Sequence, residues 1–132
     1  KLNIVKKILG IVVLGLLLSS NAYAKVISLS CIFQNAYDGG SLMKPTNDMY
    51  AYISDDTEIS LDYDNESING LETPVWNENK IIGKLNRTLK GGIKLNTTLT
   101  LNRNTGKLKQ EITGKYGTTT INFKCSKAKK KF

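Results

Sequence analysis

The chain has 132 residues, a formal net charge of +8, two cysteines and no histidine. A length of this order fits one small domain. Histidine is the commonest general base and the commonest metal ligand, so its absence excludes the usual Ser-His, Cys-His and zinc-protease sites, and we expect neither enzymatic activity nor a cofactor.

Residues 1–24 are predicted to be a helical secretory signal peptide. Three lysines lie within the first seven residues, residues 8–18 are apolar and uncharged, and residues 22–24 supply an Ala-Tyr-Ala cleavage motif. A bilayer-spanning helix needs ~20 apolar residues, so a membrane anchor is the less favoured interpretation. The leader predicts export to the periplasm or secretion.

The exported part is predicted to be one domain, residues 25–126, followed by a basic tail, residues 127–132, that holds four lysines. Its charge is split along the chain. Residues 25–78 carry two basic and ten acidic side chains, whereas residues 79–132 carry fourteen basic side chains and one acidic. Two interpretations stay open: attraction between strands from the two halves, or a bipolar surface that meets a charged partner.

Hydrophobic and polar residues alternate along most of the exported chain, which is typical of half-buried β-strands. The longest alternation covers residues 93–101, and no stretch shows a helical period over three turns. Thr, Ile and Tyr are abundant, which also favours strands. The predicted strands cover residues 27–33, 49–53, 59–63, 81–85, 93–101, 108–112 and 121–125.

Turn residues separate these strands at a spacing of about ten residues, which predicts a meander. Asn69 and Gly70 form the dipeptide of a two-residue type I′ turn, because both positions need positive φ. Gly106 is predicted in the left-handed region. Pro74 is predicted on an edge strand or in a loop that covers the barrel mouth, because proline cannot donate to a central ladder. Further turns are predicted at residues 54–57, 90–92, 102–106 and 114–117, and the longest loop at residues 34–47.

The strands and turns predict an all-β fold, a small antiparallel up-and-down barrel or half-barrel of about seven or eight strands. A two-sheet β-sandwich is the alternative. Cys31 lies on the apolar side of the first predicted strand and Cys125 on that of the last. In an exported protein this pair predicts a disulfide between the two ends of the domain, with two buried free thiols as the alternative.

Acidic residues offer two weak candidates for chemistry. Residues 62–66 have the alternating carboxylates of a calcium loop, but they lack the glycine and the bidentate glutamate of that motif. Asp55, Asp62 and Asp64 supply carboxylates that a small hydrolase could use as acid and base. A solvated turn is the preferred interpretation in both cases, so we predict no metal site and no catalytic residue.

Five aromatic residues are the candidate ligand-binding residues, because their rings combine apolar area with a polar group. Packing in the core or on the rim of the barrel is the preferred interpretation for these residues. The lysine tail predicts at most weak contact with anionic lipid and no specific nucleic-acid binding. We expect a monomer. Outer-membrane barrels carry aromatic girdles that recur strand by strand, and the sequence shows none, so it does not favour such a barrel.

The five candidate ligand-binding residues are Tyr50, Tyr52, Tyr63, Trp76 and Tyr116.

The C-terminal region carries a resemblance to known proteins. Residues 101–108 read Leu-Asn-Arg-Asn-Thr-Gly-Lys-Leu, and residues 123–127 read Phe-Lys-Cys-Ser-Lys before a Lys-rich end at Phe132. This part resembles the C-terminal half of small exported β-sheet proteins of marine bacteria, which implies export and a β topology but no activity. In architecture the chain is distantly similar to the periplasmic lysozyme inhibitors, although their Ser-Gly-x-x-Tyr loop has no counterpart here.

Export, the missing catalytic residue sets and the split charge together predict a non-catalytic binding or accessory module of the cell envelope. Its expected partner is an envelope component or a small ligand. A periplasmic enzyme inhibitor and a small carboxylate-dependent hydrolase are the alternatives.

Overall fold

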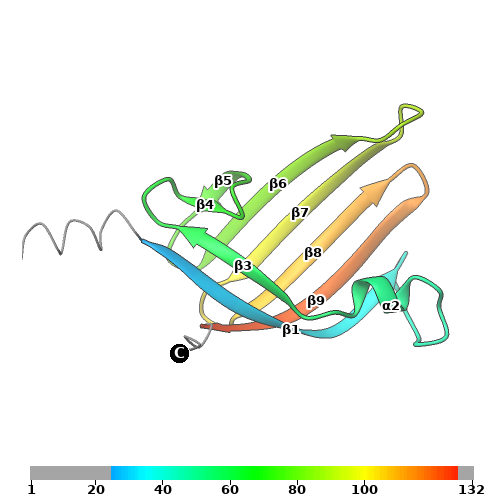
Figure 1. The fold of residues 1–132 in the computed structure, drawn as a ribbon, viewed down its shortest axis with the longest axis horizontal. Helices are drawn as coiled ribbons and strands as arrows, with labels where there is room; N and C mark the ends of the chain where they lie inside the picture. Colours follow the sequence, from blue (N-terminus) through cyan, green and yellow to red (C-terminus); the bar gives the residue numbers. More distant parts are fainter. Residues whose placement is uncertain (1–24, 128–132) are drawn as a thin grey trace, which may run out of the picture.

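The computed structural model describes residues 25–127, which form one antiparallel sheet rolled into a nearly closed barrel (Figure 1). The predicted signal peptide and residues 128–132 of the predicted tail lie outside the described residues. The elements are β1 (Val26–Asp38), β2 (Ser41–Leu42), α2 (Tyr50–Ile53), β3 (Thr57–Asp62), β4 (Ser67–Ile68), β5 (Glu72–Trp76), β6 (Lys80–Thr88), β7 (Lys94–Asn102), β8 (Lys107–Gly114) and β9 (Gly117–Lys127).

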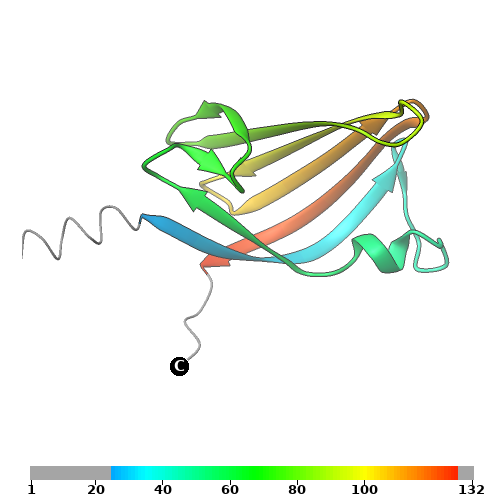
Figure 2. The ribbon, with the colours of Figure 1, turned by 45° about the horizontal axis from the view of Figure 1, so that its top comes forward.

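The strands follow an up-and-down order around the barrel. Neighbours are arranged as β4-β3-β1-β9-β8-β7-β6-β5, and the short β2 pairs with the end of β1. The pairing of β1 with β9 joins the two described strands that lie farthest apart along the chain. At one end of the barrel, here called the narrow end, β4 and β5 lie between β3 and β6, whereas the opposite, open end is split between these two strands (Figure 2). The predicted antiparallel barrel is confirmed.

Alternate residues of β6 to β9 point into the barrel and line up in rows across the sheet. The row nearest the narrow end consists of Ile81, Leu101, Leu108 and Phe123, each at most 4% exposed. Two rows closer to the open end, Leu85 is 38% exposed. The hydrophobic core therefore fills the narrow end and thins out toward the open end.

The narrow end is sealed by the connection from β4 to β5. Asn69 and Gly70 both have positive φ, at 52° and 68°, as predicted for a type I′ turn. The Asn69 side chain accepts a hydrogen bond from the Ser60 N–H at 2.8 Å, and the Asn69 N–H donates to the Ser60 carbonyl at 2.8 Å. The fully buried Ile68 lies over Gly83 of β6, where any Cβ would overlap its side chain. A glycine at this position lets β4 approach β6 without a ladder between them.

A disulfide joins the first strand to the last, as predicted. Cys31 and Cys125 are register partners in the ladder between β1 and β9, and their sulfur atoms are bonded. Beside them, the Cys125 N–H donates to the Gly106 carbonyl at 2.8 Å. Gly106 has φ +76°, and a Cβ there would approach the Cys125 carbonyl oxygen to 2.5 Å. The predicted left-handed glycine is confirmed, and its missing side chain lets the turn lie against β9.

The prediction of a strand at residues 49–53 is wrong, because Tyr50–Ile53 forms the short helix α2. Asn47 starts this turn, since its side chain accepts from the Met49 N–H at 2.9 Å and its carbonyl accepts from the Tyr50 N–H at 3.0 Å. Tyr50 and Ile53, three residues apart on one helical face, pack against the core. The alternation of Tyr50 and Tyr52 gave the false strand signal.

The predicted loop at residues 34–47 is also too long. β1 continues to Asp38 and pairs back with β2, so Tyr37 lies opposite Leu42. The ladder with β9 shifts between Phe33 and Asn35, which indicates a β-bulge at Gln34. Before the bulge the odd-numbered residues of β1 point inward, and after it the even-numbered Ala36 does. This change interrupts the period-two pattern, so the sequence did not reveal the second half of the strand. Pro74, in contrast, lies on β5 at the edge of the sheet, as predicted.

We expect the double variant Cys31→Ala/Cys125→Ala to lower the free energy of unfolding by roughly 2–5 kcal/mol, because the bond closes a loop with a sequence separation of 94. Urea denaturation of the exported protein measures this change. Reducing the disulfide of the wild type is the matched control and should produce the same loss, while unchanged stability in both experiments would contradict the role of the bond.

Candidate binding groove

The open end exposes part of the inner face of the sheet. The row of Leu85, Thr97 and Ile112 crosses β6, β7 and β8 in register, and none of these side chains is buried. Leu89 and Ile93, at the β6–β7 turn, are also exposed. The inner face is therefore only partly covered at this end, and its exposed apolar side chains, Leu85, Leu89 and Ile93, indicate a candidate interaction site.

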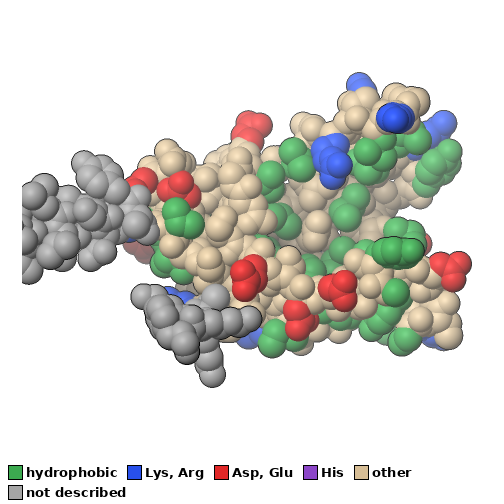
Figure 3. Space-filling model, in the orientation of Figure 1, with side chains coloured by type: hydrophobic (Ala, Val, Ile, Leu, Met, Phe, Trp, Pro, Cys, Tyr) green, Lys and Arg blue, Asp and Glu red, His purple; other side chains and the backbone are tan. Residues whose placement is uncertain are grey.

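A groove of about 350 Å³ runs between this inner face and the segment formed by α2 and the start of β3. We call it the open-end groove. Figure 3 shows the hollow with hydrophobic side chains on both sides. The floor comes from β8 and β9, and the outer wall comes from α2 and the residues after it. Its lining residues are Tyr52, Ile53, Asp55, Asp56, Thr57, Gln110, Ile112, Ile121 and Phe123.

The two sides of the groove carry opposite charge. Asp55 and Asp56 belong to the outer wall, and Asp56, just before the start of β3, also accepts a hydrogen bond from the Phe33 N–H at 3.0 Å. Across the opening, residues 84–94 of the β6–β7 hairpin contain four basic side chains and no acidic one. Figure 3 shows the same separation, with basic side chains over the hairpin and acidic ones along the opposite side. The charge split of the sequence thus becomes a bipolar surface at the open end.

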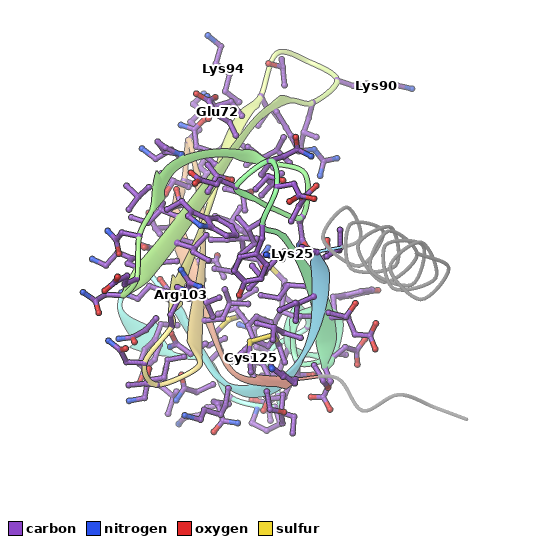
Figure 4. The ribbon with its side chains drawn as sticks, turned by 90° about the vertical axis from the view of Figure 1, so that its left-hand side faces the viewer. Lys25, Glu72, Lys90, Lys94, Arg103 and Cys125 are labelled. Atoms are coloured by element: carbon purple, nitrogen blue, oxygen red, sulfur yellow. A yellow bond between two sulfur atoms is a disulfide. The ribbon has the colours of Figure 1, made fainter. Side chains whose placement is uncertain are left out.

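A second cluster lies around Arg103, which Figure 4 shows at the narrow end. Arg103 contacts two aromatic rings there. Its guanidinium carbon is 5.6 Å from the ring centroids of both Tyr63 and Trp76, and these rings meet edge to face at 5.3 Å. Arg103 also donates to the Asn77 carbonyl at 2.7 Å, and its backbone N–H donates to the Asn79 carbonyl at 2.8 Å. With its donors and ring contacts engaged, Arg103 ties the β7–β8 turn to the segment after β5.

The five candidate aromatic residues are not brought together in one site. Tyr63 and Trp76 belong to the Arg103 cluster, while Tyr50 packs edge to face on Phe33 at 5.6 Å. Tyr52 is 85% exposed on the rim of the open-end groove, and Tyr116 is 91% exposed at the β8–β9 turn. Of the candidates, Tyr52 alone lines this groove.

The acidic residues after β3 form a turn. Asp62 accepts hydrogen bonds from the backbone N–H groups of Asp64 and Asn65 and from the Asn65 side chain, at 2.8–3.1 Å. The bonds from Asn65, and then the bond from Asp64, hold the pKa of Asp62 below its ordinary value. Within residues 25–127 there is no cluster of three His, Cys, Asp or Glu residues that could hold a metal ion. Asp62 is thus engaged as a turn former.

The carboxylates of the hydrolase hypothesis lie at opposite ends of β3. Asp55 precedes this strand and Asp62 ends it. At about 3.3 Å per residue the two are roughly 20 Å apart, whereas paired glycosidase carboxylates lie within about 10 Å of each other. The structure therefore does not assemble this predicted pair.

The comparisons with known proteins identify no function for the groove, so its interpretation rests on its geometry. No family model matches the chain, and neither the curated proteins nor the solved structures contain a match. The resemblances to exported proteins of marine bacteria and to lysozyme inhibitors stay predictions. Within the described part of the chain, no helix is long and apolar enough to cross a membrane.

The sequence did not reveal Ile112 as a groove residue or Leu85 as its exposed neighbour on the inner face, because their alternation looks the same as that of the core. The available signal was the hairpin that follows Leu85. Leu89 and Ile93 flank a Gly-Gly turn, where exposed polar residues are usual. Apolar residues around such a turn indicate a hairpin that extends beyond the core.

We expect Arg103→Lys to lower the free energy of unfolding by roughly 1–2 kcal/mol, because an ammonium cannot contact both rings and keep the same hydrogen bonds. Trp76 is the only tryptophan of the chain, so its fluorescence reports the change during urea denaturation. Arg87→Lys, at the exposed end of β6, is the matched control. Equal losses for both variants would exclude the clamp role of Arg103.

We expect Asp62→Asn to make stability less dependent on pH in acid. Because the folded pKa lies below the ordinary value of 3.8, the carboxylate stabilises the fold above that pH, and this contribution is lost as the pH falls through the folded pKa. Urea denaturation at about pH 6 and about pH 2 should show a smaller drop for the variant than for the wild type. An identical drop would show that these hydrogen bonds do not favour the ionised form.

Proposed function

We propose that the protein is a non-catalytic binding module of the cell envelope and that it takes an apolar ligand group in the open-end groove. The observation that carries this proposal is the partly uncovered inner face of β6 to β8 at the open end. Leu85 and Ile112 lie there on the side of the sheet that forms the core elsewhere. Binding a ligand would remove this apolar surface from water, which is favourable at roughly 25 cal/mol per Å².

The groove has the build of a recognition site. Its floor is apolar apart from Gln110, and polar groups stand only at its sides, where Asp55 and Asp56 face a basic hairpin. Binding sites commonly combine an apolar base with a few polar groups that fix orientation. The ligand class favoured by this arrangement is amphipathic, with apolar groups directed at the floor and polar groups at the rim.

Placement in the envelope is supported by two features. The first is the disulfide between Cys31 and Cys125. Disulfides persist in oxidising compartments and are rare in cytosolic proteins. The first 24 residues have the charge and hydrophobic pattern of a signal peptide. Both features fit a protein that acts after export.

We expect the purified exported protein to bind anilinonaphthalene sulfonate at one saturable site, since this dye emits strongly on apolar surfaces. Ile112→Asn should weaken binding roughly fivefold by removing part of the apolar floor. The control is Ile32→Asn, because Ile32 is 53% exposed on the outer face of β1. Fluorescence titration measures both, and an equal effect of the two substitutions would place binding outside the groove.

A further inference from the structure

The strand β6 has a free edge at the open end. Its pairing with β5 extends to Lys84, which lies opposite Glu72. From Leu85 to Thr88 it pairs with β7 alone among the described strands, and all four residues are exposed. A strand with one unpaired edge is a template for another strand.

The direction of the backbone groups along this edge follows from the hairpin. The Leu89 N–H donates to the Ile93 carbonyl at 2.7 Å, so the odd-numbered residues of β6 direct their backbone groups toward β7. The even-numbered residues direct theirs away from β7. At the open end these are Asn86 and Thr88, which present two N–H donors and two carbonyl acceptors at the opening.

The strand on the other side of the opening shows the same pattern. The Tyr63 N–H donates to the Lys25 carbonyl, so odd-numbered residues of β3 face β1 and even-numbered ones face the opening. Toward the narrow end, the Ser60 groups are satisfied by Asn69. One step toward the open end, Glu58 has no paired strand on that side within the described residues. We call the gap between β3 and β6 the seam. Backbone groups along the seam are thus hydrogen-bonded at the narrow end, whereas toward the open end they lack a paired strand among the described residues.

We propose that an extended segment of a partner protein adds to β6 as an antiparallel strand, with alternate side chains in the open-end groove and acidic residues near the β6–β7 turn. This inference rests on the proposed function and names the ligand class. The added strand would hydrogen-bond Asn86 and Thr88, and its inward side chains would cover Leu85 and Ile112. Antiparallel addition continues the pattern of every ladder in the sheet.

Charge favours a partner protein over a second copy of this chain. Pairing of two β6 edges would bring the basic hairpins of both molecules together, and like charges on adjacent strands are destabilising. Lys90 and Lys94 extend from the hairpin away from the barrel (Figure 4). A strand with acidic residues at its N-terminal end would place them there, because antiparallel addition puts that end beside the C-terminal end of β6. Lys84 and Arg87 add to the same positive field.

The test uses a short peptide, blocked at both ends, that begins with two glutamates and continues with valine alternating with threonine. We expect saturable binding to the exported protein by isothermal titration calorimetry. Methylating the peptide nitrogens that face β6 should weaken binding roughly tenfold, because it removes the edge hydrogen bonds. Replacing the glutamates by lysines should weaken binding to a similar degree at low salt, and the difference should shrink as salt screens the charges.

The matched protein variants are Asn86→Pro and Asn86→Ala. Proline removes the one N–H that points from residue 86 to the opening and leaves the ladder to β7 intact, whereas alanine keeps that N–H. We expect a roughly tenfold loss of affinity for Asn86→Pro and a change of less than about twofold for Asn86→Ala. Equal urea denaturation curves show that the variants are folded. The methylated peptide tests the same bonds with wild-type protein should Asn86→Pro be unstable.

Each outcome decides between the claims. If the dye binds in the groove but neither peptide methylation nor Asn86→Pro changes the peptide affinity, strand addition is overturned and the proposed function stays in place. Failure of dye and peptide to bind would overturn both. A dimer in sedimentation velocity that Asn86→Pro dissociates would assign the edge to a second copy and overturn the partner segment.

Discussion

The pairing of β1 with β9 is the contact on which the barrel depends. The other ladders join strands that follow one another along the chain, apart from that of β1 with β3, which spans β2 and α2, and hairpins between consecutive strands form locally. Closing β1 onto β9 brings together residues separated by almost the whole domain, at the largest cost in loop entropy. Cys31 and Cys125 sit in this ladder, so the covalent bond reinforces the contact that costs the chain most. With that closure made, the inner faces of all the long strands enclose one core.

The difference between the two ends follows from strand length. β4 has two residues and β5 has five, whereas β6 to β9 have eight to eleven. The short strands can fill the seam over only part of its length, where Ile68 and the Arg103 cluster complete the seal. Past Lys84 of β6 and Ser60 of β3, the two strands continue without a paired strand across the seam among residues 25–127. The opening is thus a geometric result of joining short strands to long ones.

The sequence predicts the barrel well because alternation and turn chemistry are local. The strand from Lys94 to Asn102, the type I′ turn at Asn69 and the left-handed Gly106 all followed from neighbouring residues. Errors arose where tertiary contacts overrode the pattern. Packing of Tyr50 on Phe33 favours a helical turn, and the bulge at Gln34 changes the alternation within β1. The groove was beyond prediction, since it depends on how far β5 extends along β6, which no local pattern encodes.

The seam between β3 and β6 differs at its two ends in a way that fits the proposed strand addition. An unpaired strand edge beside apolar side chains invites aggregation, and proteins usually cover or charge such edges. This chain covers the edge at the narrow end, where Asn69 satisfies Ser60. At the open end it leaves Asn86 and Thr88 uncovered and surrounds them with lysine and arginine. Positive charge repels a second copy but attracts an acidic segment, so the same residues that limit self-association would select the partner.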